Sequence, residues 1–213
     1  MTKNLWSLLG IVALLLASPL ISPTSAVTIE STFDAGLEGW TGSTGGDLAF
    51  VSTGGNPGGF LQQTDTDLSD MFVMAPASFL GDKSAFLNGT LSFDARQVGG
   101  NGEKYAPFGF VSLFNGGNAI SIDIAGANAP SSDWTTYSVK LDGAGFETTP
   151  EAVAAILSNV TMIMVQLESQ IGAVEVTGMD NFRMVSEVPE PATLLMASLG
   201  LCGALSLVRR RAA

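Results

Sequence analysis

The residue types that carry out nucleophilic and metal chemistry are scarce in this sequence. There is no histidine, so Ser-His-Asp and Cys-His catalysis and histidine-bound zinc are excluded. The one cysteine, Cys202, lies in an apolar segment near the C-terminus, so the middle of the chain has no disulfide and no thiolate ligand. The candidates that remain for chemistry are carboxylates and a few aromatic side chains.

Three aspartates are candidate ligands of a structural Ca²⁺ ion. Asp34 follows the first expected strand, Asp47 precedes the second, and Asp180 lies in the last. The first and last strands commonly pair in jelly rolls, and calcium binds carboxylate and carbonyl oxygens, so these side chains could converge. The alternative, which is the commoner role of such acids, is to cap loops in contact with solvent. The acidic segment 65–70 lacks the glycine and the closing glutamate of an EF-hand loop, and we expect a solvated turn there.

A sugar-binding site needs an exposed aromatic ring beside fixed polar groups, and the aromatic candidates are Trp40, Tyr105, Trp134 and Tyr137. Tyr105 lies next to Lys104 in a glycine-rich loop and is a candidate glycan contact, as is Trp134 at the start of an expected strand. Trp40 and Trp134 both flank strand starts, where a tryptophan more commonly fills the core.

Glycoside hydrolysis needs two carboxyl groups placed together. Asp94, Asp123 and Glu168 lie in expected strands but form no cluster in the sequence, and scattered carboxylates on solvated faces explain them. The sequence therefore does not support an enzyme. A polysaccharide-modifying enzyme that uses these three acids is the alternative.

The charge of the middle of the chain restricts its partners. Residues 27–187 contain nineteen acidic and five basic residues, a formal charge of −14. Such a surface repels phosphate backbones, which excludes nucleic acid as a partner, and it keeps the domain soluble while attracting divalent cations.

Residues 1–26 have the pattern of a secretory signal peptide. Lys3 precedes an apolar run from Leu5 to Leu16 that is too short to span a bilayer, and small residues follow Pro23. We predict cleavage by signal peptidase after Ala26. An uncleaved N-terminal anchor is the alternative.

The C-terminal segment 188–213 has three parts. Two prolines frame the first part, an apolar run over residues 192–208 forms the second, and three arginines follow. Seventeen helical residues span about 25 Å, enough for a thin hydrocarbon core. The arginines favour the cytoplasmic side, which places the preceding domain outside the inner membrane. The residues of this motif are Val188, Pro189, Glu190, Pro191, Arg209, Arg210 and Arg211.

This three-part tail resembles the PEP-CTERM sorting signal of Gram-negative bacteria. The resemblance implies processing by an exosortase, a membrane protease-transpeptidase, after transient anchoring in the inner membrane. It further implies delivery to the cell surface or to an extracellular polysaccharide matrix. An ordinary single-span anchor, which has no need of the Pro-Glu-Pro entry, is the alternative.

Between the two ends, short β-prone segments alternate with Gly, Asn, Asp and Ser, which is typical of a β-sandwich. Within one segment Leu91 and Phe93 point to one face and Ser92 and Asp94 to the other. One short helix is expected after Thr149, with Pro150 in its first turn and its end near residues 158–159. The expected strands are 27–33, 48–52, 60–63, 71–74, 90–95, 108–114, 119–124, 134–141, 160–168 and 173–185, with a candidate break at Gly178.

Residues 33–184 resemble the laminin B domain, also called laminin IV type A. That family has a strand ending in Ala-Pro, a Phe-Leu-Gly-Asp turn and a Gly-x-Leu-x-Phe strand. The resemblance implies an all-β jelly-roll sandwich of the galactose-binding-like kind, without known catalysis. The cysteine-rich repeats that flank the animal domain are absent from this sequence. The matching segments are Ala75-Pro76, Phe79–Asp82, Gly89–Phe93, Trp134–Leu141, Thr149–Glu151, Ile156–Thr161 and Gly178–Asn181.

Together these features predict a signal peptide (1–26), a laminin B-like sandwich (27–187) and a sorting tail (188–213). We expect a non-enzymatic surface or matrix protein that acts in adhesion or binds exopolysaccharide. A purely structural surface protein without a ligand is a further alternative.

Overall fold

The computed structural model describes residues 25–187 apart from positions 44, 101, 105–107 and 172–174. Residues 26–187 form one compact unit. The predicted signal peptide, apart from its last two residues, lies outside the described residues, as do the sorting motif from Val188 to Arg211, the apolar run 192–208, and Tyr105. The described helices include none that is long and apolar enough to cross a membrane.

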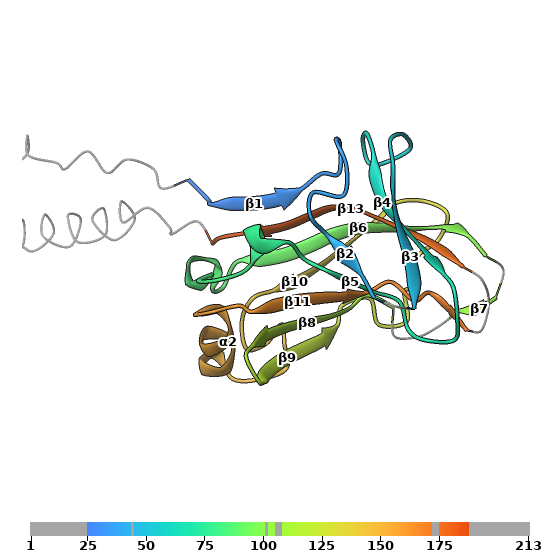
Figure 1. Ribbon diagram of the computed structural model, residues 1–213. Coiled ribbons are helices and arrows are strands. Elements are labelled where there is room, and N and C mark those ends of the chain that lie inside the picture. The colour runs from blue at the N-terminus through green and yellow to red at the C-terminus, as the bar shows by residue number, and fades with distance from the viewer. Residues whose placement is uncertain (1–24, 44, 101, 105–107, 172–174, 188–213) are drawn as a thin grey trace, which may run out of the picture. The chain divides into compact units, whose positions relative to one another are not determined.

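Two antiparallel sheets lie against each other as the layers of a sandwich (Figure 1). Sheet A has the order β10 (Thr135–Lys140), β6 (Thr90–Gly99), β13 (Val176–Val185), β4 (Phe60–Asp65) and β3 (Gly46–Val51), and β1 (Thr28–Ser31) also pairs with β13. Sheet B has the order β2 (Thr41–Gly42), β5 (Phe72–Met74), β11 (Met162–Gln166), β8 (Phe110–Asn115) and β9 (Asn118–Asp123). A small third pair joins β7 (Glu103–Lys104) to β12 (Gln170–Ile171).

The expected alternation along β6 is confirmed on its inner face, because Leu91, Phe93 and Ala95 are all fully buried. On the outer face the expectation of a solvated carboxylate is wrong, since Asp94 is only 3% exposed. Periodicity assigns a side chain to a face of the sheet but does not show whether a distant loop covers that face.

Trp40 is a core residue, as its position at a strand start favours. It is 3% exposed and lies 4.8 Å from Phe182, 5.9 Å from Phe33 and 6.0 Å from Phe79, measured between ring centroids. Its indole N–H donates to the Ser31 hydroxyl over 3.0 Å, which satisfies the one polar group of the ring. We call Phe33, Trp40, Phe79 and Phe182 the aromatic cluster.

The predicted helix is α2 (Pro150–Leu157), and it packs near one end of β8 and β9 (Figure 1). The Thr149 hydroxyl accepts a hydrogen bond from the Ala152 N–H over 3.2 Å, which is the expected N-cap. Val153 and Leu157 point into the core and are fully buried. The helix therefore closes the apolar interior at this end.

The Phe-Leu-Gly-Asp motif starts at the last residue of one single-turn 3₁₀ helix, η1 (Ala77–Phe79), and ends before a second, η2 (Ser84–Phe86). Gly81 has a φ of +84°, a conformation that favours glycine. The Asp82 carboxylate accepts a hydrogen bond from the Ser84 N–H over 2.9 Å, and this bond lowers the pKa of Asp82 below its ordinary value. The motif has a structural role in this turn, as its chemistry predicts.

The candidate break at Gly178 is wrong, because β13 continues through this residue to Val185. Gly178 is required for another reason: a Cβ atom there would lie 3.0 Å from the Phe60 ring and 3.2 Å from the Trp134 ring. The register of β13 with β6 shifts at two other places, between Val176 and Thr177 and between Asp180 and Arg183. The two-residue strands β2, β7 and β12 are too short to show any periodicity in the sequence.

Candidate functional site

A polar cluster holds the loop between β3 and β4 (residues 52–59) against the outer face of sheet A. Asp94 and Asp180 lie opposite each other on β6 and β13. The Asn56 N–H donates to Asp180 Oδ2 over 2.6 Å, and its side-chain amide donates to Asp94 Oδ2 over 3.0 Å. The Asn181 amide donates to the same Asp94 oxygen over 2.8 Å. We call these four residues the Asn56 cluster.

The Asp180 carboxylate of this cluster lies in an environment that disfavours its charged form. Burial raises the pKa of Asp180, and the nearby Asp94 and Asp34 carboxylates raise it further. The backbone N–H groups of Asn56 and Asn181 oppose this shift by donating to the carboxylate. Asp180 is completely buried, so its oxygens serve to fix the loop rather than to contact a solvent-borne ligand.

Two of the three aspartates predicted to bind calcium approach the same loop. Asp34 is exposed and accepts a hydrogen bond from the Thr32 hydroxyl over 3.0 Å, and its Oδ1 lies 2.0 Å from the position that a Cβ on Gly58 would occupy. Asp47 is exposed and lies apart, opposite Thr64, towards the far end of β3 from this loop. Within the described part of the chain, no group of three or more acids or cysteines is placed to hold a metal ion.

Trp134, a predicted glycan contact, is half-buried on the outer face of sheet A. The Arg96 guanidinium carbon lies 5.0 Å from the Trp134 ring centroid and 5.1 Å from that of Phe60, so the cation lies against both rings. The indole N–H donates to the Gly54 carbonyl over 3.1 Å. Trp134 thus helps to fix the same loop, and Arg96 occupies one side of its ring.

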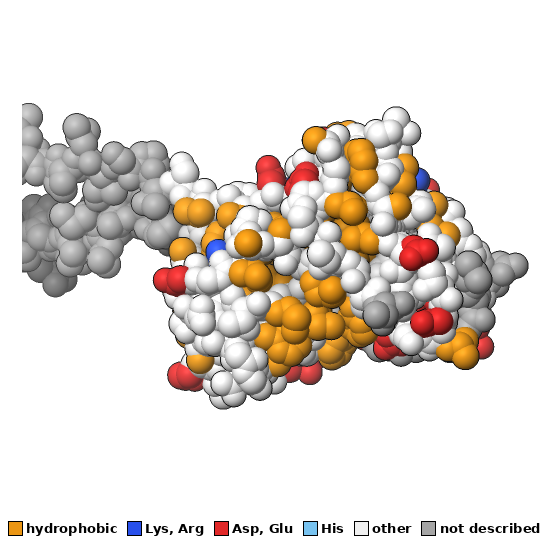
Figure 2. Space-filling view, in the orientation of Figure 1, with side chains coloured by type: hydrophobic (Ala, Val, Ile, Leu, Met, Phe, Trp, Pro, Cys, Tyr) orange, Lys and Arg blue, Asp and Glu red, His pale blue; other side chains and the backbone are white. Residues whose placement is uncertain are grey.

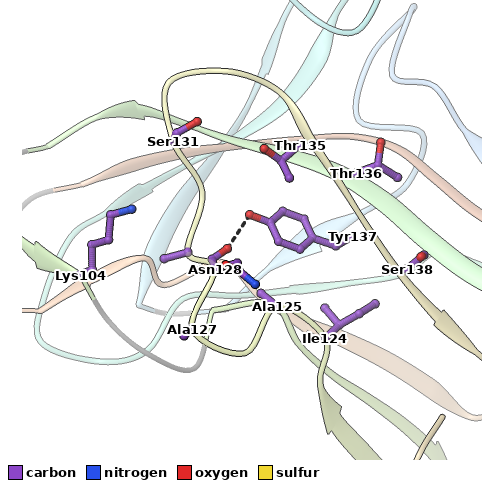
Figure 3. Close-up of a pocket in the computed structure, with 11 residues that line it drawn as sticks. Lys104, Ile124, Ala125, Ala127, Asn128, Ser131, Thr135, Thr136, Tyr137 and Ser138 are labelled. Atoms are coloured by element: carbon purple, nitrogen blue, oxygen red, sulfur yellow. Dashed lines mark hydrogen bonds between the residues drawn. The ribbon is translucent and has the colours of Figure 1, made fainter.

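A pocket of about 600 Å³ lies beside the edge strand β10 (Figure 3). The Tyr137 ring is buried, stacks on Phe93 at 5.7 Å and donates its hydroxyl to the Asn128 carbonyl over 2.8 Å. Burial raises the pKa of Tyr137, so the phenol remains protonated and can donate at neutral pH. The residues that line the pocket are Lys104, Ile124, Ala125, Ala127, Asn128, Ala129, Ser131, Thr135, Thr136, Tyr137 and Ser138.

The lining of this pocket combines hydrogen-bonding groups with small apolar ones. Ser131, Thr135 and Ser138 supply hydroxyls, and Asn128 supplies an amide. Lys104 extends from β7 towards these side chains (Figure 3). None of the described lining residues is a carboxylate. The pocket can therefore bind a polar, hydroxyl-rich molecule but offers no acid–base pair among those residues. The signal in the sequence is the hydroxyl-rich run 131–138, which strand periodicity alone does not mark as a site.

A second group of carboxyls is buried in the sandwich interior. Glu175 is fully buried and accepts hydrogen bonds from the Ser169 N–H over 2.6 Å and from the Ser169 hydroxyl over 2.9 Å. Glu168 accepts a bond from the Met71 N–H over 3.2 Å. The pKa of each glutamate is raised to about 7, mainly by burial. The Glu175 carboxylate adds to the rise for Glu168, and the Asp65 carboxylate adds to the rise for both. We call Asp65, Glu168 and Glu175 the acidic cluster.

The acidic cluster corrects the expectation for the segment 65–70. Asp65 is only 5% exposed, although residues 66–70 are exposed as a solvated turn requires. The three acids considered for catalysis do not meet: Asp94 belongs to the Asn56 cluster, Glu168 to the acidic cluster, and Asp123 caps a turn on β9 by accepting the Gly126 N–H over 2.8 Å.

Solved structures with a similar fold include carbohydrate-binding modules. The C-terminal family 22 module of Clostridium thermocellum Xyn10B aligns with 76% of this chain and 95% of its own, at 12% identity and a TM-score of 0.51. The CBM22-2 xylan-binding domain of Paenibacillus barcinonensis Xyn10C aligns with 74% of this chain and 98% of its own, at 11% identity and a TM-score of 0.50. An exo-beta-agarase aligns with 78% of this chain but only 26% of its own, at 16% identity and a TM-score of 0.52. These likenesses confirm the fold, a jelly-roll β-sandwich. No curated protein matches the sequence.

Residues 187–212 match the PEP-CTERM protein-sorting motif, which confirms the resemblance of the tail. The match includes the two prolines and the three arginines. The motif indicates an exported protein that is sorted to the cell envelope.

Residues 72–198 match the family described as Laminin B (Domain IV). The match begins later than the resemblance found in the sequence, so residues 33–71 lie outside it, and it overlaps the sorting motif between residues 187 and 198. It includes the Ala-Pro, Phe-Leu-Gly-Asp and Gly-x-Leu-x-Phe segments. Because the match covers more than half of the 213 residues, the chain belongs to the laminin B (Domain IV) family.

Proposed function

We propose that this protein is a non-catalytic surface or matrix component that binds extracellular polysaccharide in the pocket beside β10. The observation that carries the proposal is the pocket of about 600 Å³, whose described lining supplies hydroxyl, amide and ammonium groups and no carboxylate. A sugar ring presents hydroxyls at its edge and C–H groups on its faces, which suits this mixture of polar and small apolar side chains. Xylan-binding modules with a similar fold add support to the choice of ligand class.

The pocket binds by hydrogen bonding around a rigid wall. Tyr137 is held by Phe93 and by its bond to the Asn128 carbonyl, so this wall needs no rearrangement to receive a ligand. Lys104 and the serine and threonine hydroxyls donate to sugar oxygens. A small set of such bonds gives weak affinity for one sugar, and display of many copies along a polymer multiplies it.

The sorting tail supports a location for this binding at the cell surface. We infer that an exosortase recognises Val188–Pro191 with the following apolar segment and processes the chain, after signal peptidase has cleaved behind Ala26. The acidic domain is then released to, or displayed on, the cell surface, where extracellular polysaccharide is its partner.

The test is to fill the pocket. Ala127 is exposed and lines it, so Ala127→Trp adds bulk there without removing a core contact. Ala144→Trp is the matched control, since Ala144 is exposed in a turn and does not line the pocket. Protein in its processed form, recovered from cells with the sorting machinery, is run on affinity gels that contain xylan, agarose or the cells' own polysaccharide.

We expect the wild type and Ala144→Trp to be retarded in at least one of the gels and Ala127→Trp to lose most of that retardation. If the wild type runs unretarded in all the gels, or if Ala127→Trp matches it, the pocket is not a polysaccharide site. Release of reducing ends during the incubation would overturn the non-catalytic part of the proposal.

A further inference from the structure

The outer face of sheet B carries apolar side chains where a solvated sheet face normally carries polar ones. Strand register places Thr41, Met74, Met164, Ser112 and Ser121 in one row across the five strands. The residues that alternate with them point into the sandwich and are buried. These inward residues are Val73, Val111, Leu113, Ile120, Ile163 and Val165.

Two further rows flank the first. Phe110 lies opposite Asp123, and Phe72 lies opposite Gln166, on one side. Met162 lies opposite Phe114 on the other. Each of the outward phenylalanines and methionines is half-buried, so a part of each side chain is accessible while its base is packed. Hydrophobic side chains gather over β5, β11 and β8 in Figure 2.

This face is nearly free of charge on a strongly acidic domain. Residues 27–187 have nineteen acidic and five basic residues, yet the strands of sheet B contribute only Asp123, which lies on the edge strand β9. An anionic polymer is repelled by the rest of the domain and gains no cation from these strands. The charge distribution therefore favours an uncharged partner.

The size of the face argues against a second copy of the chain. Four strand spacings of about 4.8 Å and six residues at about 3.4 Å give a projected area of roughly 400 Å². A stable protein interface buries about 800 Å² on each partner. Two copies would also bring together two domains that each carry a formal charge of −14. A narrow, uncharged chain needs neither the area nor the opposite charge.

We propose that the outer face of sheet B is a second carbohydrate contact surface, which binds an extended, uncharged polysaccharide chain. The proposal rests on the proposed function for its class of ligand but uses different residues on the other sheet. The C–H faces of the sugar rings pack on Phe110, Phe114 and the methionines. The paired hydroxyls of Ser112 and Ser121, 2.8 Å apart, bond the sugar hydroxyls at the middle of the face.

Met164→Gln tests this surface at its centre, because the substitution keeps the length of the side chain and makes it polar. Val98→Gln is the matched control, since Val98 is an exposed apolar residue on β6 of sheet A. Ser121→Arg is a second variant that adds bulk on an exposed position and removes no core contact. Binding of the processed protein to unsubstituted xylan, agarose and alginate is measured at 50 and 500 mM NaCl.

We expect Met164→Gln and Ser121→Arg each to weaken binding to xylan or agarose at least fivefold, with Val98→Gln unchanged. Binding of the neutral polymers should not depend on salt, and alginate should bind no better than they do. If Ala127→Trp abolishes binding while both sheet B variants match the wild type, this proposal is overturned and the proposed function stands. If the wild type binds no polysaccharide, both are overturned. A wild-type dimer in sedimentation that Met164→Gln converts to a monomer would assign the face to a second copy instead.

Discussion

The sandwich buries two regions of opposite character near the two ends of β13. Near one end of the strand, Phe182 packs in the aromatic cluster beside Trp40. At the other end, Glu175 directly precedes β13 and lies in the acidic cluster with Glu168 and Asp65. Both groups are almost fully excluded from solvent. The buried positions of this fold therefore hold carboxyl groups as well as apolar side chains.

The two regions gain stability in different ways. The aromatic cluster depends on contact area and on ring geometry, with centroids 4.8 to 6.0 Å apart, and neither depends on pH. The acidic cluster depends on protons and on hydrogen bonds from Ser169 and Met71, because charged carboxylates are costly to bury. A change of conditions should therefore affect one region and leave the other intact.

The largest expected effect comes from the aromatic cluster. Trp40→Ala removes ring contacts with three phenylalanines and leaves a cavity, so we expect a loss of about 3–5 kcal/mol in the free energy of unfolding. Chemical denaturation of the wild type and the variant measures it. The loss should be the same at pH 5 and pH 8. A loss under about 1 kcal/mol would mean that the cluster is loosely packed.

A smaller effect, of pH, should come from the acidic cluster. Its glutamates have a pKa of about 7 in the folded protein against an ordinary value of 4.5. Between these values the folded state holds more protons than the unfolded state, so stability is fully present below about pH 4.5 and falls as pH rises towards 7. Thermal unfolding at pH 4.5, 6 and 8 measures the fall.

Glu175→Gln sharpens this test because a neutral amide cannot ionise. We expect the variant to be more stable than the wild type at pH 8, by on the order of 1 kcal/mol, and to show a shallower dependence on pH. Glu30→Gln, at an exposed position on β1, is the control and should keep the wild-type dependence. A wild type whose stability is flat between pH 4.5 and 8 would contradict the assignment of raised pKa values.

The smallest expected effect is that of calcium. Both buried groups of carboxyls are satisfied by N–H and hydroxyl donors, and Asp180 already accepts bonds on both oxygens, so we expect nearly equal melting temperatures in 2 mM CaCl₂ and in EGTA. A rise of several degrees with calcium would show that the carboxylates near Asp34 hold a metal. Asp34→Asn should then remove the rise.

Local patterns predicted much of the fold. The alternation at Leu91 and Phe93, the cap at Thr149 and the turn at Gly81 each depend on a few neighbouring residues, and each appears as expected. The candidate sites were harder to predict. Asp47 lies apart from the loop that Asp34 approaches. The Trp134 side chain holds that loop through a hydrogen bond to the Gly54 carbonyl.

The sequence by itself determined the strand-rich middle, the helix cap and the sorting motif, because these follow from the order and period of adjacent residues. The tertiary structure alone decided that Asn56 bonds Asp180, 124 positions away, and that a hydroxyl-rich run beside β10 lines a pocket. It also decided that Asp65, Glu168 and Glu175 share one buried environment. The physical reason is that such contacts depend on strand order and register across two sheets, which no local spacing of residues encodes.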